Sequence, residues 1–172
     1  MTLLPFGPSF FRLAFAVTWS ESVQAQTLPE PVGEIILTVT GQITQTNASG
    51  AARFDHTMLA ALGPVSFDTT TIWTDGVQTF TGIPLAVIVA HVGAQGATIA
   101  ATALNDYRVE IPMSDAVEGG PILAYSQNGD PLSARDKGPI WLIYPYDSNS
   151  AYRSDVVYAR SIWQLDRMDI TP

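Results

Sequence analysis

The sequence contains no cysteine among its 172 residues, which excludes disulfides, thiolate nucleophiles, iron–sulfur clusters and thiolate ligands for metals. Histidine is scarce too. His56 and His91 are the only two, and neither has a second histidine or a carboxylate at the spacing of a metal site. We therefore expect solvated or packed histidines and no metal site. No serine stands in a G-x-S-x-G turn, which leaves a serine hydrolase without support.

Positive charge is the next shortage. Eight basic residues face 16 acidic ones, and the formal net charge is -8. Nucleic acids and anionic membrane surfaces both require a basic patch, so the sequence argues against either as a partner. With 47% hydrophobic and 14% charged residues, the chain has the composition of a globular protein and about the length of one domain.

The N-terminus differs from the rest of the chain. Phe10 to Trp19 is a short apolar run that contains only Arg12, and Val23-Gln24-Ala25 offers small residues at the two positions that a signal peptidase reads. We predict a signal peptide over residues 1–25, cleaved after Ala25, and a periplasmic or secreted domain over residues 26–172. The alternatives are an N-terminal helix that packs on the domain, or a misplaced start codon. No later apolar stretch is long enough to span a membrane.

Between Glu34 and Ile111 the sequence predicts strands and short helices from the alternation of apolar residues, from turn residues and from helix caps. Short helices are expected after Asp55, as an N-cap, and at Pro84. Strands are expected at Glu34–Thr40, at Phe67–Trp73 with Val77–Phe80, and at Thr98–Leu104 with Tyr107–Ile111 around an Asn105-Asp106 turn. Hairpins with helices between them predict a single α+β domain with a mixed, largely antiparallel sheet core.

The stretch from Leu123 to Pro145 is the centre of this expected fold. Strands at Ile122–Ser126 and Pro139–Tyr144 flank an Asn128-Gly129 turn and a polar loop from Ser133 to Gly138, where binding chemistry commonly sits. Trp141 and Leu142 are expected on a central strand. The chain should end with a loop around Arg153 and Asp155 and a last strand around Ile162 to Ile170.

Three kinds of side chain are candidates for chemistry. Asp106, Asp115 and Glu118 are close in sequence, but turn and cap carboxylates explain them better than an acid–base pair. Aromatic residues are dense near the C-terminus and could line a pocket for a flat ligand, or fill the core: Trp141, Tyr144, Tyr146, Tyr152, Tyr158 and Trp163. Four basic residues in the same region could form an anion site: Arg135, Lys137, Arg153 and Arg160.

Several fragments together resemble the oxidoreductase molybdopterin-binding domain family, which includes sulfite oxidase, assimilatory nitrate reductase and the periplasmic methionine sulfoxide reductase catalytic subunit. They are Gly82-Ile83-Pro84-Leu85, Leu104-Asn105-Asp106-Tyr107, Ile111-Pro112, Ala124-Tyr125, Asn128-Gly129, Pro131-Leu132 and Gly138-Pro139. The most specific piece is the G-x-P-L helix start followed about forty residues later by the AY...NG.PL...GP block. The resemblance covers about Glu34 to Ile170 and implies the sulfite-oxidase molybdopterin-domain fold.

The resemblance also implies a cofactor site from which this chain departs. Relatives hold molybdenum with a cysteine about twelve residues before the G-x-P-L turn, where this chain has Thr70, a far poorer ligand. The counterparts of a phosphate-binding arginine and lysine are Trp141 and Trp163. A molybdopterin is possible by resemblance, but these departures favour no cofactor. The candidate cofactor-binding positions are Thr70, Asn105, Arg135, Asp136, Lys137, Trp141 and Arg160.

Two functions follow. The first is an exported binding or accessory module that kept the fold and lost the molybdenum chemistry. It would bind a small anionic or aromatic ligand, or dock on a membrane sensor or redox partner. The second is an active molybdopterin-dependent oxidoreductase that holds its metal through ligands other than cysteine.

Overall fold

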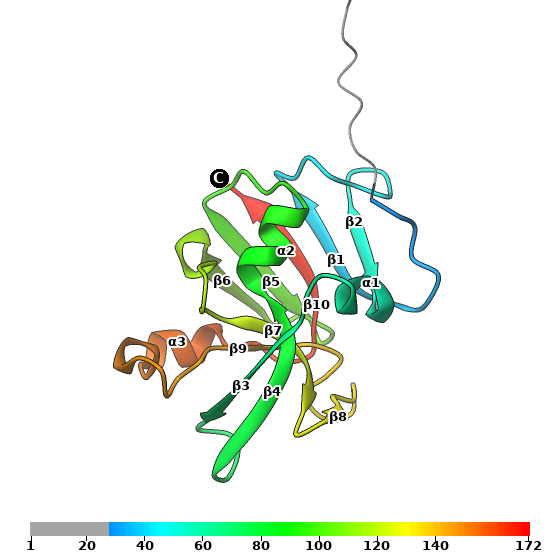
Figure 1. The fold of residues 1–172 in the computed structure, drawn as a ribbon. Helices are drawn as coiled ribbons and strands as arrows, with labels where there is room; N and C mark the ends of the chain where they lie inside the picture. The colour runs from blue at the N-terminus through cyan, green and yellow to red at the C-terminus, as the bar shows by residue number, and fades with distance from the viewer. Residues whose placement is uncertain (1–27) are drawn as a thin grey trace, which may run out of the picture.

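Residues 28–172, the part of the chain that the computed structural model describes, form two β-sheets around one hydrophobic core (Figure 1). The predicted signal peptide lies outside these residues. None of the helices in this range has both the length and the apolar character that a membrane crossing requires.

The first sheet has the strand order β2-β1-β10-β5-β6. Its strands are β1 (Ile35–Gly41), β2 (Ala52–Asp55), β5 (Thr98–Ala103), β6 (Arg108–Pro112) and β10 (Leu165–Thr171). β1 and β10 pair in parallel, and the other neighbours are antiparallel. Leu37 and Val39 are fully buried on one face of β1, as the alternation of its sequence predicts.

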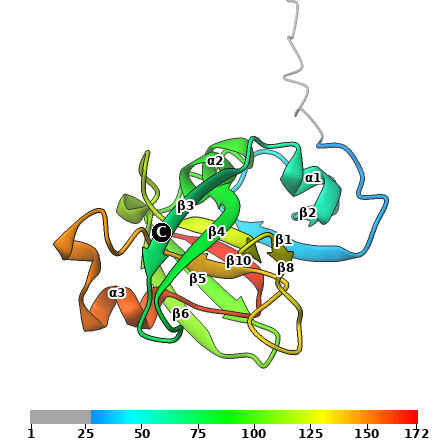
Figure 2. The same ribbon diagram turned by 60° about the horizontal axis from the view of Figure 1, so that its bottom comes forward.

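The second sheet has the order β3-β4-β7-β8, with β9 paired to β7. Its strands are β3 (Val65–Thr70), β4 (Val77–Pro84), β7 (Ile122–Gln127), β8 (Asp130–Pro131) and β9 (Trp141–Ile143). The β3–β4 hairpin runs across the first sheet in Figure 2. Gly82 lies where β4 passes close to β7, and a Cβ there would collide with the carbonyl oxygen of Leu123. This close approach explains the glycine of the G-x-P-L motif.

Short helices connect the strands: α1 (His56–Ala60), α2 (Leu85–His91) and α3 (Asp155–Arg160), with single 3-10 turns at Met113–Asp115 and Ser150–Tyr152. The predicted caps are confirmed. The Asp55 carboxylate accepts from the backbone N–H of Met58 at 2.8 Å, and Pro84 precedes α2, whose Leu85 and Ile88 are fully buried. The predicted α+β class with a largely antiparallel core is also confirmed.

Four local expectations were wrong. Strand β3 ends at Thr70, so Trp73 leaves the sheet, and the short strand β2 was missed. The segment after Arg153 is helix α3 rather than a loop, and the side chain of Ser154 caps it. Strand β9 pairs only with β7, so Trp141 lies on an outer strand of its sheet. All three residues of β9 are nevertheless buried, so the strand is covered on both faces.

Candidate functional site

Trp73 stands at the centre of an aromatic group that joins segments far apart in the sequence. Its ring centroid lies 5.8 Å from that of Trp141, 6.4 Å from Tyr146, 5.9 Å from Tyr158 and 5.8 Å from Trp163. Each pair meets edge to face, which is the favoured geometry for aromatic contacts. We call these five residues the Trp73 cluster. They fix the turn after β3 against β9 and α3.

Trp141 forms the buried side of this cluster. It is fully buried, its indole N–H donates to the carbonyl oxygen of Ser161 at 3.2 Å, and its ring lies 5.5 Å from that of Phe80. An indole whose one donor is satisfied is a stable core residue. Trp141 was a candidate cofactor-binding residue, and its burial assigns it to the core.

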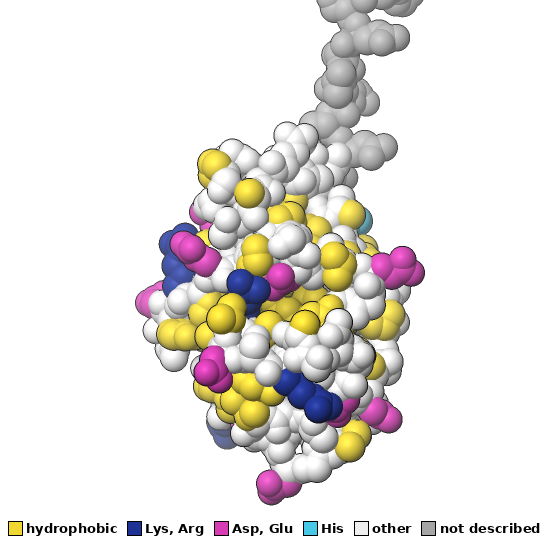
Figure 3. All heavy atoms as spheres, turned by 90° about the vertical axis from the view of Figure 1, so that its left-hand side faces the viewer, with side chains coloured by type: hydrophobic (Ala, Val, Ile, Leu, Met, Phe, Trp, Pro, Cys, Tyr) yellow, Lys and Arg dark blue, Asp and Glu magenta, His cyan; other side chains and the backbone are white. Residues whose placement is uncertain are grey.

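The exposed side of the cluster borders a pocket of about 450 Å³. Four aromatic residues line it, namely Trp73, Tyr107, Tyr158 and Trp163, and Asn105 adds an amide. No lysine, arginine, aspartate or glutamate is among the lining residues. Figure 3 faces the side of the molecule that carries α3 and β6 and shows hydrophobic side chains gathered in its middle, with a basic and an acidic side chain among them and further charged side chains around them. The pocket is therefore mainly aromatic, and no charged side chain lines it.

Asn105 supplies directional polarity at this pocket. Its Oδ1 accepts a hydrogen bond from the backbone N–H of Tyr107 at 3.1 Å, which shapes the turn between β5 and β6. Its Nδ2 donates to no described residue, so the amide can offer hydrogen bonds to a ligand. Among the seven candidate positions, Asn105 is the one that lines the pocket.

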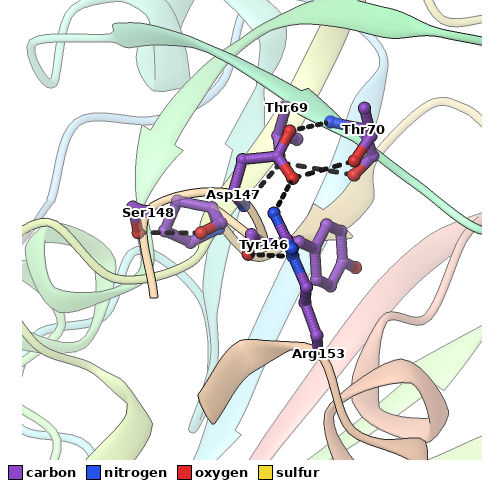
Figure 4. A network of polar contacts seen from close by, with 7 residues as sticks. Thr69, Thr70, Tyr146, Asp147, Ser148 and Arg153 are labelled. Carbon is purple, nitrogen blue, oxygen red and sulfur yellow. Dashed lines mark hydrogen bonds and ion pairs between the residues drawn. The ribbon is translucent and has the colours of Figure 1, made fainter. Parts of the chain in front are cut away.

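Thr70 belongs to a polar network, shown in Figure 4. Its backbone N–H and its hydroxyl both donate to the Asp147 carboxylate, at 2.6 Å and 2.8 Å. The Arg153 guanidinium donates to the same carboxylate at 2.6 Å and to the carbonyl oxygen of Tyr146 at 3.0 Å. These bonds, led by the Thr70 backbone N–H, hold the pKa of Asp147 below its ordinary value. The Thr70 hydroxyl is thus committed within the protein.

Arg160 lies in a second polar network. Its guanidinium donates to the Asp115 carboxylate at 3.0 Å, and the Tyr144 hydroxyl donates to the same oxygen at 2.7 Å. Burial of the phenol, and then its bond to Asp115, raise the pKa of Tyr144 far above its ordinary value. This arrangement fastens α3 to the 3-10 turn at Met113–Asp115. Arg160 is therefore a structural cation.

The loop from Ser133 to Gly138 contacts the Trp73 cluster at Trp141, through the side chain of Lys137. Lys137 places its ammonium 5.3 Å from the ring centre of Trp141 and 3.2 Å from the Asp136 carboxylate. The backbone N–H of Gln164 donates to the Lys137 carbonyl oxygen at 3.0 Å, which ties the loop to the chain before β10. Arg135 and Asp136 are exposed. Lys137 of this loop and Trp73 both contact Trp141. Thr70 lies in a different set of contacts, because it donates to Asp147.

The structure therefore does not gather the seven candidate residues into one site. Asn105 lines the pocket. Trp141 is buried in the core and Lys137 contacts its ring. Thr70 and Arg160 each belong to a separate polar network. Trp73 and Tyr107 were not among the expected pocket residues, although both border turns that the sequence did predict. Tyr158 and Trp163 were recognised as possible pocket aromatics, and both line it.

Comparison with known families explains the fold. The family model described as the oxidoreductase molybdopterin-binding domain matches residues 50–151, which is more than half of the chain. The chain belongs to this family. Among solved structures, its fold is similar to that of the sulfane dehydrogenase SoxCD from Paracoccus pantotrophus, with a TM-score of 0.59 and 16% identity. No curated protein matches the chain in sequence.

The match to the sulfane dehydrogenase covers 78% of this chain and 37% of that one, so this chain spans little more than a third of the larger protein. The likeness shows a shared fold and confirms the resemblance drawn from the sequence motifs.

Membership of this family makes a molybdopterin a possible ligand, but the residues present do not fit the cofactor. The chain has no thiolate, and residues 28–172 contain no group of three histidine, aspartate or glutamate side chains placed to hold a metal. Three of the four basic residues expected at an anion site are already paired with carboxylates: Lys137 with Asp136, Arg153 with Asp147, and Arg160 with Asp115. The pocket itself offers no cation for a phosphate.

Proposed function

We propose that this chain is an exported ligand-binding or accessory module that retains the molybdopterin-domain fold without molybdenum chemistry. Its ligand binds in the aromatic pocket beside Trp73. The observation that carries the proposal is the pocket lining, in which four aromatic rings and one amide stand without a charged side chain. Such a lining favours flat or apolar groups over a phosphorylated cofactor.

The family resemblance supports this assignment from a second direction. It places Trp141 and Trp163 where relatives carry a phosphate-binding arginine and lysine. In this structure the two indoles lie 6.4 Å apart and both contact Trp73. By that resemblance, aromatic rings stand where cations would hold an anionic cofactor. Of the ligands expected from the sequence, the aromatic class fits this pocket better than the anionic class.

The competing enzyme would need a metal ligand other than cysteine. The Thr70 hydroxyl, at the position that the resemblance assigns to the ligand, donates to Asp147. A neutral hydroxyl that donates to a carboxylate is a far poorer ligand for molybdenum than a thiolate. The observed contacts therefore favour the binding module.

A first experiment decides between the two readings. Protein isolated from its native host is analysed for molybdenum and for pterin fluorescence. We expect neither at stoichiometric level. Stoichiometric molybdenum would refute the cofactor-free module and transfer the assignment to the oxidoreductase.

A second experiment tests the pocket directly. Nitrogen-15 labelled protein is titrated with a set of small neutral, cationic and anionic compounds while the indole N–H signals of Trp73 and Trp163 are followed by NMR. We expect at least one compound to shift both signals, and its affinity, followed at the Trp73 signal that remains, to fall in Trp163→Leu. Tyr125→Leu is the matched control, since it removes an aromatic ring on β7 that does not line the pocket. A set without any pocket ligand would contradict the proposal.

Partners remain part of the same proposal. A membrane sensor or a redox protein would have to bind an acidic domain, so a complementary basic surface on the partner is expected. Export after Ala25 would place such an encounter in the periplasm or outside the cell.

A further inference from the structure

We propose that the pocket beside Trp73 selects a methylated ammonium group, so that its ligand is a small organic cation of the quaternary ammonium class. This inference rests on the proposed ligand-binding function and names the chemistry of the ligand. It is carried by the angles between the rings, by the charge around them, and by the lack of a carboxylate in the lining.

The rings form walls in more than one direction. The Tyr158 ring stands at 87° to that of Trp73, and the Trp163 ring stands at 80° to it. Tyr107, with 55% of its surface exposed, adds a fourth aromatic residue to the same lining. The face of an aromatic ring carries negative electrostatic potential, and rings at steep angles can place such faces on several sides of one cation.

Charge on the protein favours the same ligand. Residues 28–172 contain 7 basic and 15 acidic residues, because Arg12 and Glu21 are the charged residues of the segment before them. The resulting negative potential attracts cations toward the surface. No basic side chain lines the pocket to oppose them, and two of the predicted anion-binding cations, Lys137 and Arg160, are engaged with carboxylates.

The lining also determines which kind of cation fits. A primary ammonium has three N–H donors, and burying them without acceptors costs free energy. The lining offers hydroxyl and amide oxygens but no carboxylate to balance a primary ammonium. A trimethylammonium group has no N–H to satisfy. It spreads its charge over methyl groups that can contact the rings directly.

A neutral isostere separates attraction to charge from simple burial of methyl groups. Choline and 3,3-dimethylbutan-1-ol have nearly the same shape, but only choline is charged. We expect choline to bind at the Trp73 and Trp163 indole signals about tenfold more tightly than the neutral alcohol, the ratio that a cation–π contact of ordinary strength provides. Ethanolamine, a primary ammonium of related structure, should bind more weakly than choline.

Variants assign the effect to the rings. Trp163→Leu keeps an apolar side chain and removes the π face, so choline affinity should fall about tenfold while the alcohol changes much less. Trp163→Phe should fall between the wild type and Trp163→Leu. Tyr125→Leu, outside the pocket, should leave both affinities unchanged. Because Trp163 is 38% exposed, these variants are expected to fold, which urea unfolding checks.

The outcomes distinguish this inference from the function on which it rests. Equal affinity for choline and 3,3-dimethylbutan-1-ol, or a choline affinity that Trp163→Leu leaves unchanged, would overturn the cation assignment. If choline fails to bind at about 10 mM while indole shifts the same signals, the cation assignment is wrong and the binding module stands. If neither choline nor indole nor inorganic phosphate shifts the two indole signals, the pocket binds none of these ligand classes, and both the ligand-binding proposal and the cation assignment are wrong.

Discussion

Replacing Asp147 with alanine is expected to loosen the attachment of β3, an outer strand, to the body of the domain. The Asp147 carboxylate accepts two hydrogen bonds from Thr70 and one from Arg153. The carboxylate therefore joins the end of β3 to the segment that connects β9 with α3, which contains both Asp147 and Arg153. If Thr70 has this structural role, its energetic contribution must depend on Asp147.

The expected magnitude follows from the bonds that are lost. Hydrogen bonds to a charged group contribute about 1.5 to 3 kcal/mol each when well protected. The Asp147 side chain is 31% exposed and that of Arg153 is 53% exposed, so solvent screening reduces the effect. We expect Asp147→Ala to lower the free energy of unfolding by about 2 kcal/mol, and Thr70→Val, which removes only the hydroxyl, by about 1 kcal/mol.

A double-mutant cycle measured by urea unfolding at pH 7 tests the connection. The cost of Thr70→Val should nearly vanish in the Asp147→Ala background, which corresponds to a coupling of about 1 kcal/mol. Thr79→Val is the matched control: its hydroxyl donates to Asp68 at 2.6 Å within the β3–β4 hairpin, so it should show no coupling to Asp147. Additive effects of Thr70→Val and Asp147→Ala would refute the structural role of Thr70.

The same carboxylate gives the effect a defined pH dependence. Its pKa is lowered in the folded state, first by the Thr70 backbone N–H, then by the Thr70 hydroxyl and Arg153. Stability from such a group is fully present above the unfolded-state pKa, about 3.9 for aspartate, and is lost as pH falls through the folded-state value. The difference between wild type and Asp147→Ala should therefore shrink below about pH 4.

Four further outcomes are expected. Asp55→Ala should lower the melting temperature, since the carboxylate caps α1 through Met58, and its lowered pKa means that the wild-type advantage is lost at acidic pH. Trp141→Ala should cost about 3 to 5 kcal/mol in urea unfolding because the indole is fully buried. Thr70→Cys should not bring stoichiometric molybdenum into the protein by metal analysis, because the pocket still lacks cations. Mass spectrometry of the exported protein should find cleavage after Ala25, and an intact Met1 would contradict export.

Local signals made much of the fold predictable. The Asn105-Asp106 and Asn128-Gly129 turns were expected from residues that tolerate positive φ, and Asp106 and Asn128 adopt φ values of 64° and 53°. The caps of α1 and α2 were equally local. By contrast, the parallel pairing of β1 with β10 joins strands at opposite ends of the chain, and no short-range pattern encodes such a pairing.

The site was harder to predict because its walls come from distant segments. Trp73 reaches Tyr158 and Trp163 only because β3 ends at Thr70 and releases the next residues from the sheet. The threonine-rich run continues past Thr70 and reads as strand throughout, so the sequence conceals this exit. The start of helix α3, by contrast, does carry a local signal, namely Ser154 as N-cap followed by Asp155 in the first turn.

Trp141 is fully buried in contact with two of the residues that line the pocket, Trp73 and Trp163. A guanidinium at this position would be surrounded by Phe80 and Trp73 and would require a buried anion as its partner. The indole needs only one acceptor, which the Ser161 carbonyl oxygen provides. Trp141 itself therefore needs no anionic partner. The exposed rings of the same cluster are left free to line a pocket of different chemistry.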